Sequence, residues 1–295
     1  MGLQDEAIQL SEATLAALRE FALEKGVGSA VAQADVGAVD VVRAVQQHFD
    51  VKEKETMFHI SHGDVALELL GLKRELGQTL DSTGLTIWRA ADHLCEYVVA
   101  NRDLFENKYV CELGCGLGVV AILLDKLNVN ATIVATDGDD KAISLLIKNM
   151  NSNACSARLV AHKLWWSELD EDNAAFLQSL APQETSCGGE AAVSSSIGSG
   201  SSGTSGSRPL RKFDLILAAD VIYDDAAVQP LAASAAALLS KPGGQILLAF
   251  ARRNVPIAAF WEAAESRGLA WEKLKDCGSE AGRDNEAIYR LFWQK

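Results

Sequence analysis

Three glycines stand at alternate positions between an apolar run typical of a β-strand and an apolar run typical of a helix: Gly114, Gly116 and Gly118. Glycine can take the positive φ angles of a tight strand-to-helix turn, and it lets a ligand approach the backbone closely. The first N–H groups of the following helix would point toward that ligand. The spacing therefore indicates a site for a nucleotide-like cofactor, with a tight turn that binds nothing as the alternative.

An acidic residue after the next strand-like run narrows the choice of cofactor. A dinucleotide-binding turn would have its third glycine at position 119, where this chain has Val119, so NAD is disfavoured. The apolar run 131–136 ends at Asp137, and an acid there can bind both ribose hydroxyls of a cofactor. Glu112 ends the preceding strand, where it can orient the glycine turn and attract a cationic group. For either acid the alternative is a solvated carboxylate at a strand end.

The pattern E-x-G-x-G-x-G followed by T-D-G, which runs from residue 112 to residue 138, resembles that of class I S-adenosylmethionine methyltransferases. The resemblance implies S-adenosylmethionine as the cofactor. It implies cofactor contacts by Glu112, Gly114, Cys115, Gly116, Gly118 and Asp137.

A second pair of polar residues follows the apolar run 215–219, which predicts a buried parallel strand. Asp220 and Tyr223 come at the carboxyl end of this strand, where ligands bind in doubly wound sheets, so we expect them to meet the glycine turn in one crevice. A lysine amine with a pKa of ~10.4 is protonated at neutral pH and must lose that proton to accept a methyl group. A neighbouring sulfonium lowers this pKa, and an acid and a phenol can hold the amine by hydrogen bonds. The alternative is that Asp220 caps the next helix and Tyr223 packs beneath it.

These motifs together resemble the seven-strand, non-SET protein-lysine methyltransferases over roughly residues 56–293. The shared features are D-x-x-Y after the strand 213–219, the T-D-G acid and G-L-x-x-W-x-A-A at 84–91. The resemblance implies catalytic roles for Asp220 and Tyr223, and cofactor contacts for Trp88, Trp166 and Ala219. The alternative for Trp88 is a structural role as a buried core residue. Because Trp165 is adjacent to Trp166, the sequence leaves the register of the motif at Trp166 open. Some motifs, such as F-A-R-R at 250–253, are most similar to the calmodulin-lysine methyltransferase branch.

The elements that must position these residues alternate between strand and helix from about residue 85 onward. This alternation predicts an α/β fold with a doubly wound, Rossmann-like sheet. We expect sheet strands at 109–113, 131–136, 157–162, 213–219, 244–251, 270–276 and 286–293. We expect helices at 88–100, 118–127, 139–151, 226–240 and 256–267. No helix separates the last two strands, and the resemblance implies the strand order 3-2-1-4-5-7-6 with the last strand antiparallel.

Three further segments complete the predicted organisation, in which the methyltransferase domain covers residues 56–295. Residues 1–55 form an expected helical extension, with helices at 10–25 and 38–49. A β-hairpin is expected at 56–72, where two strand-like runs flank a turn. The Gly/Ser-rich tract at 183–209 has too little apolar surface to order itself, so we expect a flexible insertion before the fourth sheet strand.

The amino-acid composition indicates where the protein resides and what it binds. The 295 residues are 48% hydrophobic with a formal charge of −13, and no apolar run nears the ~18 residues of a membrane span. Acids near the N-terminus argue against a targeting peptide, so we expect the protein in the cytoplasm, with the nucleus as a second compartment. We also expect a monomer. Six cysteines without a C-x-x-C pair and five scattered histidines predict no metal site. The acidic charge favours a lysine-bearing protein partner over nucleic acid.

Two other functions stay open from the sequence. A nucleic-acid base methyltransferase, for example one acting on tRNA, commonly carries N/D-P-P-Y to hold a flipped base, whereas this chain has D-V-I-Y at 220–223. A binding module that keeps the fold without catalysis is the other alternative. Loss of the glycines or of Asp137 would have indicated such a module, and this chain retains all of them.

Overall fold

The structure is a computed structural model, and it describes residues 55–73, 83–180, 211–251, 255–277 and 286–294. Nearly all of these belong to one compact unit that comprises residues 57–71 and 82–295. The predicted helices at 10–25 and 38–49 and the predicted insertion at 183–209 lie outside the described residues. Among the described helices, none combines the length and the apolar character that a membrane crossing requires.

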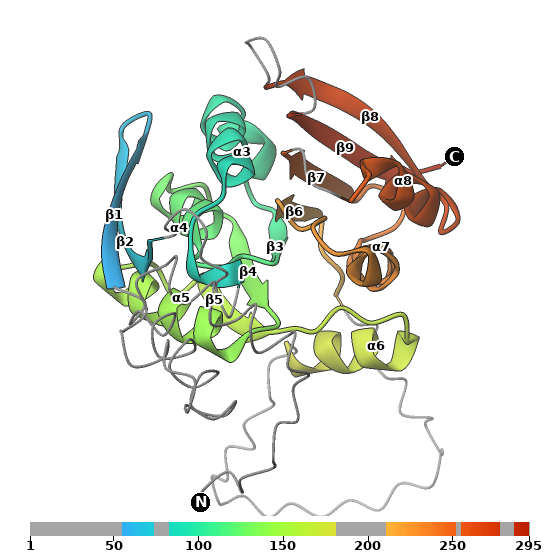
Figure 1. The fold of residues 1–295 in the computed structure, drawn as a ribbon, viewed down its shortest axis with the longest axis horizontal. Helices are drawn as coiled ribbons and strands as arrows, with labels where there is room; N and C mark the ends of the chain where they lie inside the picture. The colour runs from blue at the N-terminus through green and yellow to red at the C-terminus, as the bar shows by residue number, and fades with distance from the viewer. Residues whose placement is uncertain (1–54, 74–82, 181–210, 252–254, 278–285, 295) are drawn as a thin grey trace, which may run out of the picture. The chain divides into compact units, whose positions relative to one another are not determined.

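Seven strands form a mixed sheet with the order β5-β4-β3-β6-β7-β9-β8 (Figure 1). Their bounds are β3 Tyr109–Leu113, β4 Thr132–Asp137, β5 Leu159–Lys163, β6 Leu215–Ala219, β7 Gln245–Phe250, β8 Leu269–Asp276 and β9 Ala287–Trp293. The pairs from β5 to β7 are parallel, and β9 runs antiparallel to both β7 and β8. The predicted fold class, strand order and reversed last strand are therefore confirmed.

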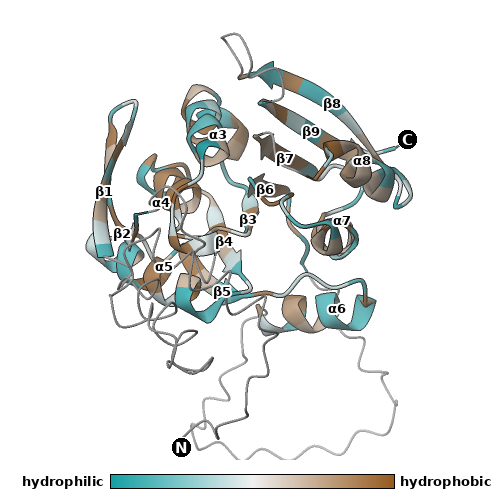
Figure 2. Ribbon diagram, viewed as in Figure 1, coloured by the Kyte–Doolittle hydropathy of each residue, from teal (hydrophilic) through white to brown (hydrophobic). Residues whose placement is uncertain are grey.

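Helices cover both faces of this sheet, because alternate side chains of each strand point to opposite sides. The helices are α3 Arg89–Ala100, α4 Val119–Lys126, α5 Asp140–Ser152, α6 Asp170–Ser179, α7 Asp225–Leu238 and α8 Ile257–Glu265. Cys111 and Leu113 of β3 share one buried cluster with α6, α7 and α8, whereas Val110 shares a second cluster with α3 and α4. Among these elements β6, β7 and α4 are strongly hydrophobic (Figure 2).

Two strands outside the main sheet form a separate hairpin, β1 (Glu55–His62) and β2 (Val65–Leu72). The exposure of β1 alternates along its whole length, whereas β2 buries Leu67 and Leu69 in the cluster that contains α3 and α4. Two short 3-10 turns, η2 (Thr83–Leu85) and η3 (Arg102–Phe105), flank α3.

Most predicted elements occur within one or two residues of their expected bounds, and α6 is the exception. No helix or strand was predicted over Asp170–Ser179. Three acids fill the first turn of this helix, and Phe176 and Leu177 are its buried apolar side chains. Acids near a helix N-terminus stabilise it through the helix dipole, so α6 forms despite a weak apolar stripe.

Candidate active site

Three parallel strands end at the same edge of the sheet and bring the predicted site residues together. Leu113 of β3 pairs with Thr136 of β4 on one side and with Ala218 of β6 on the other. The residues after these ends are therefore level with one another. This register places the glycine turn beside Asp137 and Ala219 at the carboxyl edge, where ligands bind in open α/β sheets.

The glycine turn requires glycine for both conformation and space. Gly114, Gly116 and Gly118 have φ angles of 68°, 51° and 85°. A Cβ added at Gly114 would lie 2.8 Å from Val221 Cγ1 and 3.2 Å from Trp166 Cζ2. The turn is thus in direct contact with segments that come from two other strands of the sheet.

Asp137 joins the end of β4 to the glycine turn. Its Oδ2 accepts a hydrogen bond from Gly116 N at 2.9 Å, and its Oδ1 accepts one from Asp139 N at 3.0 Å. Burial raises the pKa of Asp137 above its ordinary value, although these hydrogen bonds oppose that effect. A carboxylate has about four acceptor sites, so Asp137 keeps capacity that a ribose hydroxyl can use.

Glu112 lies beneath the turn, with its side chain 2% exposed. Its Oε2 accepts a hydrogen bond from Ala121 N in the first turn of α4 at 2.9 Å. Burial, reinforced by the nearby charge of Asp137, raises the pKa of Glu112 to about 8. The side chain therefore ties the end of β3 to α4, and it holds a proton at neutral pH.

The η2 turn lies against both Asp137 and the glycine turn. A Cβ added at Gly84 would lie 3.4 Å from Asp137 Oδ2 and 3.5 Å from Gly116 Cα. Trp88, immediately before α3, donates a hydrogen bond from its Nε1 to Thr83 O at 2.8 Å. Trp88 thus closes the turn that covers the glycines, and its half-buried indole lies on this side of the site.

Two adjacent tryptophans after β5 contact different parts of the site. Trp166 packs against Gly114 and the cluster of α6, α7 and α8. Trp165 is 70% exposed, and a Cβ added at Gly138 would lie 3.1 Å from its Cε3. Consecutive residues of an extended chain point in opposite directions, which explains the divergence. Trp165 therefore lies against Gly138, the residue that follows Asp137 at the end of β4, a position that was not predicted for either tryptophan.

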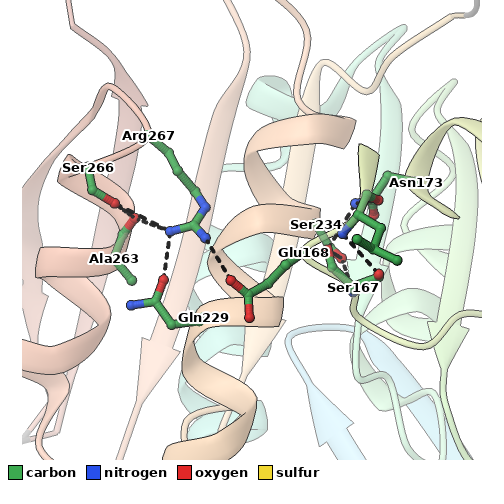
Figure 3. Close-up of polar contacts among 9 residues, drawn as sticks. Ser167, Glu168, Asn173, Gln229, Ser234, Ala263, Ser266 and Arg267 are labelled. Atoms are coloured by element: carbon green, nitrogen blue, oxygen red, sulfur yellow. Dashed lines mark hydrogen bonds and ion pairs between the residues drawn. The ribbon is translucent and has the colours of Figure 1, made fainter. Parts of the chain in front are cut away.

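A polar network holds the loop that carries these tryptophans (Figure 3). Ser167 N donates to the buried Ser234 Oγ of α7 at 2.9 Å, and Asn173 Nδ2 of α6 donates to Ser167 O at 3.0 Å. At the surface, Arg267 beyond α8 forms an ion pair with Glu168 at 3.7 Å. The backbone directly after Trp166 is therefore fixed from two helices.

Asp220 follows β6 in a left-handed backbone conformation, with φ 59°. Its side chain is buried, whereas Tyr223 is 45% exposed. The predicted alternative in which Asp220 caps the next helix is excluded, because the N-cap of α7 is Asp224, whose Oδ1 accepts from Ala226 N at 3.0 Å. Non-glycine residues in this conformation are strained and concentrate at functional sites.

The cysteines near the site are buried thiols. Cys115 N donates to Thr136 O at 2.9 Å, which fastens the glycine turn to β4. Burial raises the pKa of the Cys115 thiol well above its ordinary value, so this residue contributes its backbone. Among the described residues, no group of three or more His, Cys, Asp and Glu side chains is arranged to hold a metal ion.

A family model described as "Lysine methyltransferase" matches residues 70–178 and 204–267, which make up more than half of the chain. The chain belongs to the lysine methyltransferase family. The predicted family resemblance is thereby confirmed, and the glycine turn, Asp137 and the η2 turn all fall within the first matched segment.

Two proteins with sequences similar to this chain are both named protein-lysine N-methyltransferases. Protein-lysine N-methyltransferase EFM3 of Chaetomium thermophilum is 29% identical over 184 residues, which cover 61% of this chain and 46% of that protein. Protein-lysine N-methyltransferase EEF2KMT of Homo sapiens is 25% identical over 202 residues, which cover 65% of this chain and 52% of that protein. The chain therefore spans about half the length of these relatives.

The structure of SMU.776 complexed with SAH has a similar fold. It superposes with a TM-score of 0.52 at 10% sequence identity, over 86% of this chain and 65% of that chain. At this identity the likeness concerns the fold of the lysine methyltransferase domain alone.

Proposed function

We propose that this chain is an S-adenosylmethionine-dependent protein-lysine N-methyltransferase. The observation that carries the proposal is the contact between two halves of the site: Val221, next to Asp220, lies against Gly114 of the glycine turn. This contact supports a position of the buried Asp220 beside the proposed cofactor site. Membership of the lysine methyltransferase family supports the same reaction.

The residues of the site fit the proposed cofactor. The glycine turn presents backbone without side chains at the carboxyl edge of the sheet, and it packs against the η2 turn, since a Cβ at Gly116 would lie 3.0 Å from Gly84 O. Asp137 offers acceptor capacity to a ribose, and Trp165 and Trp166 offer aromatic faces on either side of the loop after β5. The bound cofactor would supply an electrophilic methyl group on a sulfonium. The contacts assigned to Trp88, Cys115, Gly118 and Ala219 belong to this proposal, and Glu112 contributes to it by holding the turn against α4.

In the proposed reaction, Asp220 and Tyr223 position the lysine amine. The amine must present a lone pair in line with the methyl group, and a carboxylate and a phenol can hold it by hydrogen bonds. The buried Asp220 would also favour the approach of a cationic lysine, while Tyr223 is exposed enough to reach an incoming side chain. The strained backbone at Asp220 is consistent with a residue kept for chemistry.

We propose a protein substrate in preference to nucleic acid. The segment 220–223 lacks both prolines of the N/D-P-P-Y motif, and the formal charge of −13 repels phosphates. We further propose that the protein acts as a monomer in the cytoplasm, with the nucleus as a second compartment.

Methyl-labelled S-adenosylmethionine and a cell lysate test this proposal. The purified chain should transfer label to a protein band that survives nuclease treatment and disappears after protease treatment. Label that is lost with nuclease would instead identify a nucleic-acid methyltransferase. A chain that binds no S-adenosylhomocysteine by calorimetry would contradict both activities.

A further inference from the structure

The side chains of Asn149 in α5 and of Asn153, the C-cap of that helix, bind the backbone of β2 in the way that a neighbouring strand would. Asn149 Oδ1 accepts from Leu70 N at 2.7 Å, and Asn149 Nδ2 donates to Leu70 O at 3.1 Å. One helical turn later, Asn153 Oδ1 accepts from Glu68 N at 3.1 Å and Nδ2 donates to Glu68 O at 2.7 Å. Each amide therefore pairs with both backbone groups of one strand residue.

The spacing of the two asparagines matches the spacing of the strand. Four residues of an α-helix rise about 6 Å. Two residues of a β-strand span roughly 6.6 Å. Amides at positions i and i+4 therefore meet alternate residues of β2, which fixes the register of the hairpin against the helix.

Asn149 differs from Asn153 because it also contacts the glycine turn. Its Nδ2 donates a second hydrogen bond, to Leu117 O at 3.1 Å, and Leu117 lies between Gly116 and Gly118. The Asn149 side chain is 0% exposed, whereas Asn153 is partly exposed. The buried Asn149 amide is hydrogen-bonded to three backbone groups. Because an unpaired buried polar group costs free energy, this side chain is held in one orientation.

The hairpin also packs directly on the site. A Cβ added at Gly71 in β2 would lie 2.3 Å from Leu117 Cδ1 and 3.0 Å from Leu85 O. The missing side chain at this position lets β2 approach both the glycine turn and the η2 turn, which face the predicted cofactor site. The polar and apolar contacts therefore converge on Leu117.

We propose that Asn149 is a positioning residue that couples the β1–β2 hairpin to the cofactor-binding turn. Through Asn149 the hairpin influences cofactor binding without contacting the cofactor. This inference rests on the proposed binding of S-adenosylmethionine. Because coupling is reciprocal, cofactor binding must also stabilise the contact between Asn149 and Leu70.

The variants Asn149→Ala and Asn153→Ala of the full chain test the coupling. Both lose two hydrogen bonds to β2 and one further backbone bond, which joins Asn149 to Leu117 O of the glycine turn but joins Asn153 only to Asn149 O within the helix. We expect Asn149→Ala to raise the Kd for S-adenosylhomocysteine, measured by calorimetry, about five- to tenfold, and Asn153→Ala to stay within about twofold. The KM for S-adenosylmethionine should rise with kcat nearly unchanged. Equal shifts in both variants, or no shift in Asn149→Ala, would overturn the coupling.

Amide hydrogen exchange of the wild-type chain gives a test that needs no variant. S-adenosylhomocysteine should slow exchange at Leu70 N–H several-fold more than at Glu68 N–H. Equal protection of the two amides, or no change at Leu70, overturns the inference while leaving the proposed function intact. A wild-type chain that binds no S-adenosylhomocysteine refutes the proposed function, and the inference with it.

Discussion

The carboxylate of Asp137 accepts a hydrogen bond from Gly116 N at 2.9 Å, so the acid at the end of β4 also holds the glycine turn at the end of β3. One residue therefore shapes the cofactor site and supplies a ribose contact within it. Substitutions at Asp137 should affect cofactor binding through both roles.

Asp137→Ala should weaken binding of S-adenosylhomocysteine by about 1–3 kcal/mol, because a charged acceptor of ribose hydrogen bonds is lost. Isothermal titration calorimetry measures the change. Asp139→Ala is the matched control, since the Asp139 side chain accepts from Lys141 N and caps α5. That control should lose about 1 kcal/mol of stability and keep its affinity. An unchanged Kd in Asp137→Ala would refute the assignment of this acid.

Glu112→Gln should flatten the pH dependence of stability. The pKa of Glu112 is about 8 in the folded chain, against ~4.3 in an unfolded chain. The native state therefore holds a proton that the unfolded state releases between these values, and the contribution of Glu112 to stability is lost as the pH rises through about 8. At pH 8 the variant should exceed the wild type in unfolding free energy by on the order of a few kcal/mol.

Urea denaturation at pH 5, 6.5 and 8 checks this prediction. The glutamine keeps an oxygen that can accept from Ala121 N, and the other titrating groups are common to both proteins. If the free energy of unfolding changes with pH by the same amount in the wild type and the variant, Glu112 is ionised in the folded chain.

Asp220→Gly should separate activity from stability. Glycine adopts the φ of 59° without the strain of a side chain, so the melting temperature should stay level or rise. Turnover should fall by about 100-fold or more, since the proposed partner of the lysine amine is gone. Binding of S-adenosylhomocysteine should stay within about twofold, as Asp137 and the glycine turn are intact.

Asp224→Ala is the control for this variant. It removes the N-cap of α7 and should lower stability by about 1 kcal/mol while turnover persists. If Asp220→Gly methylates at the wild-type rate, the active site lies elsewhere in the crevice.

Ser234→Ala should loosen the loop that carries Trp165 and Trp166. Ser167 N would lose its buried acceptor, which sits 2.9 Å away on α7. We expect the Kd for S-adenosylhomocysteine to rise several-fold. Glu168→Gln, which removes only the exposed ion pair with Arg267, should leave the Kd unchanged because such pairs contribute little. Equal affinity in both variants would mean that the loop does not shape the cofactor site.

Local patterns in the sequence predicted the sheet and the glycine turn. The period of apolar residues is visible within each element, and the φ angles that the turn requires restrict it to glycine at Gly114 and Gly116. The segment 170–179 lacked such a period, so α6 was not predicted. The sequence left open whether Asp220 caps α7, and only the position at which the helix begins, with Asp224 as its N-cap, excludes this.

Contacts between distant segments could not be predicted from the sequence. Leu70 and Asn149 are 79 residues apart, and Ser167 and Ser234 are 67 residues apart. A buried amide or hydroxyl leaves no periodic signal, because its partners are backbone groups that any residue carries. The orientation of Trp165 relative to Trp166 likewise depends on a one-residue register that the sequence left open.

Acid hydrolysis of the labelled protein product, followed by chromatography against methylated amino-acid standards, tests the central claim most directly. Wild-type chain with methyl-labelled S-adenosylmethionine should yield label that co-elutes with methyl-lysine, and Asp220→Gly should yield none above background. Label that elutes with another methylated amino acid, or equal label from both chains, would contradict a lysine methyltransferase that acts through Asp220.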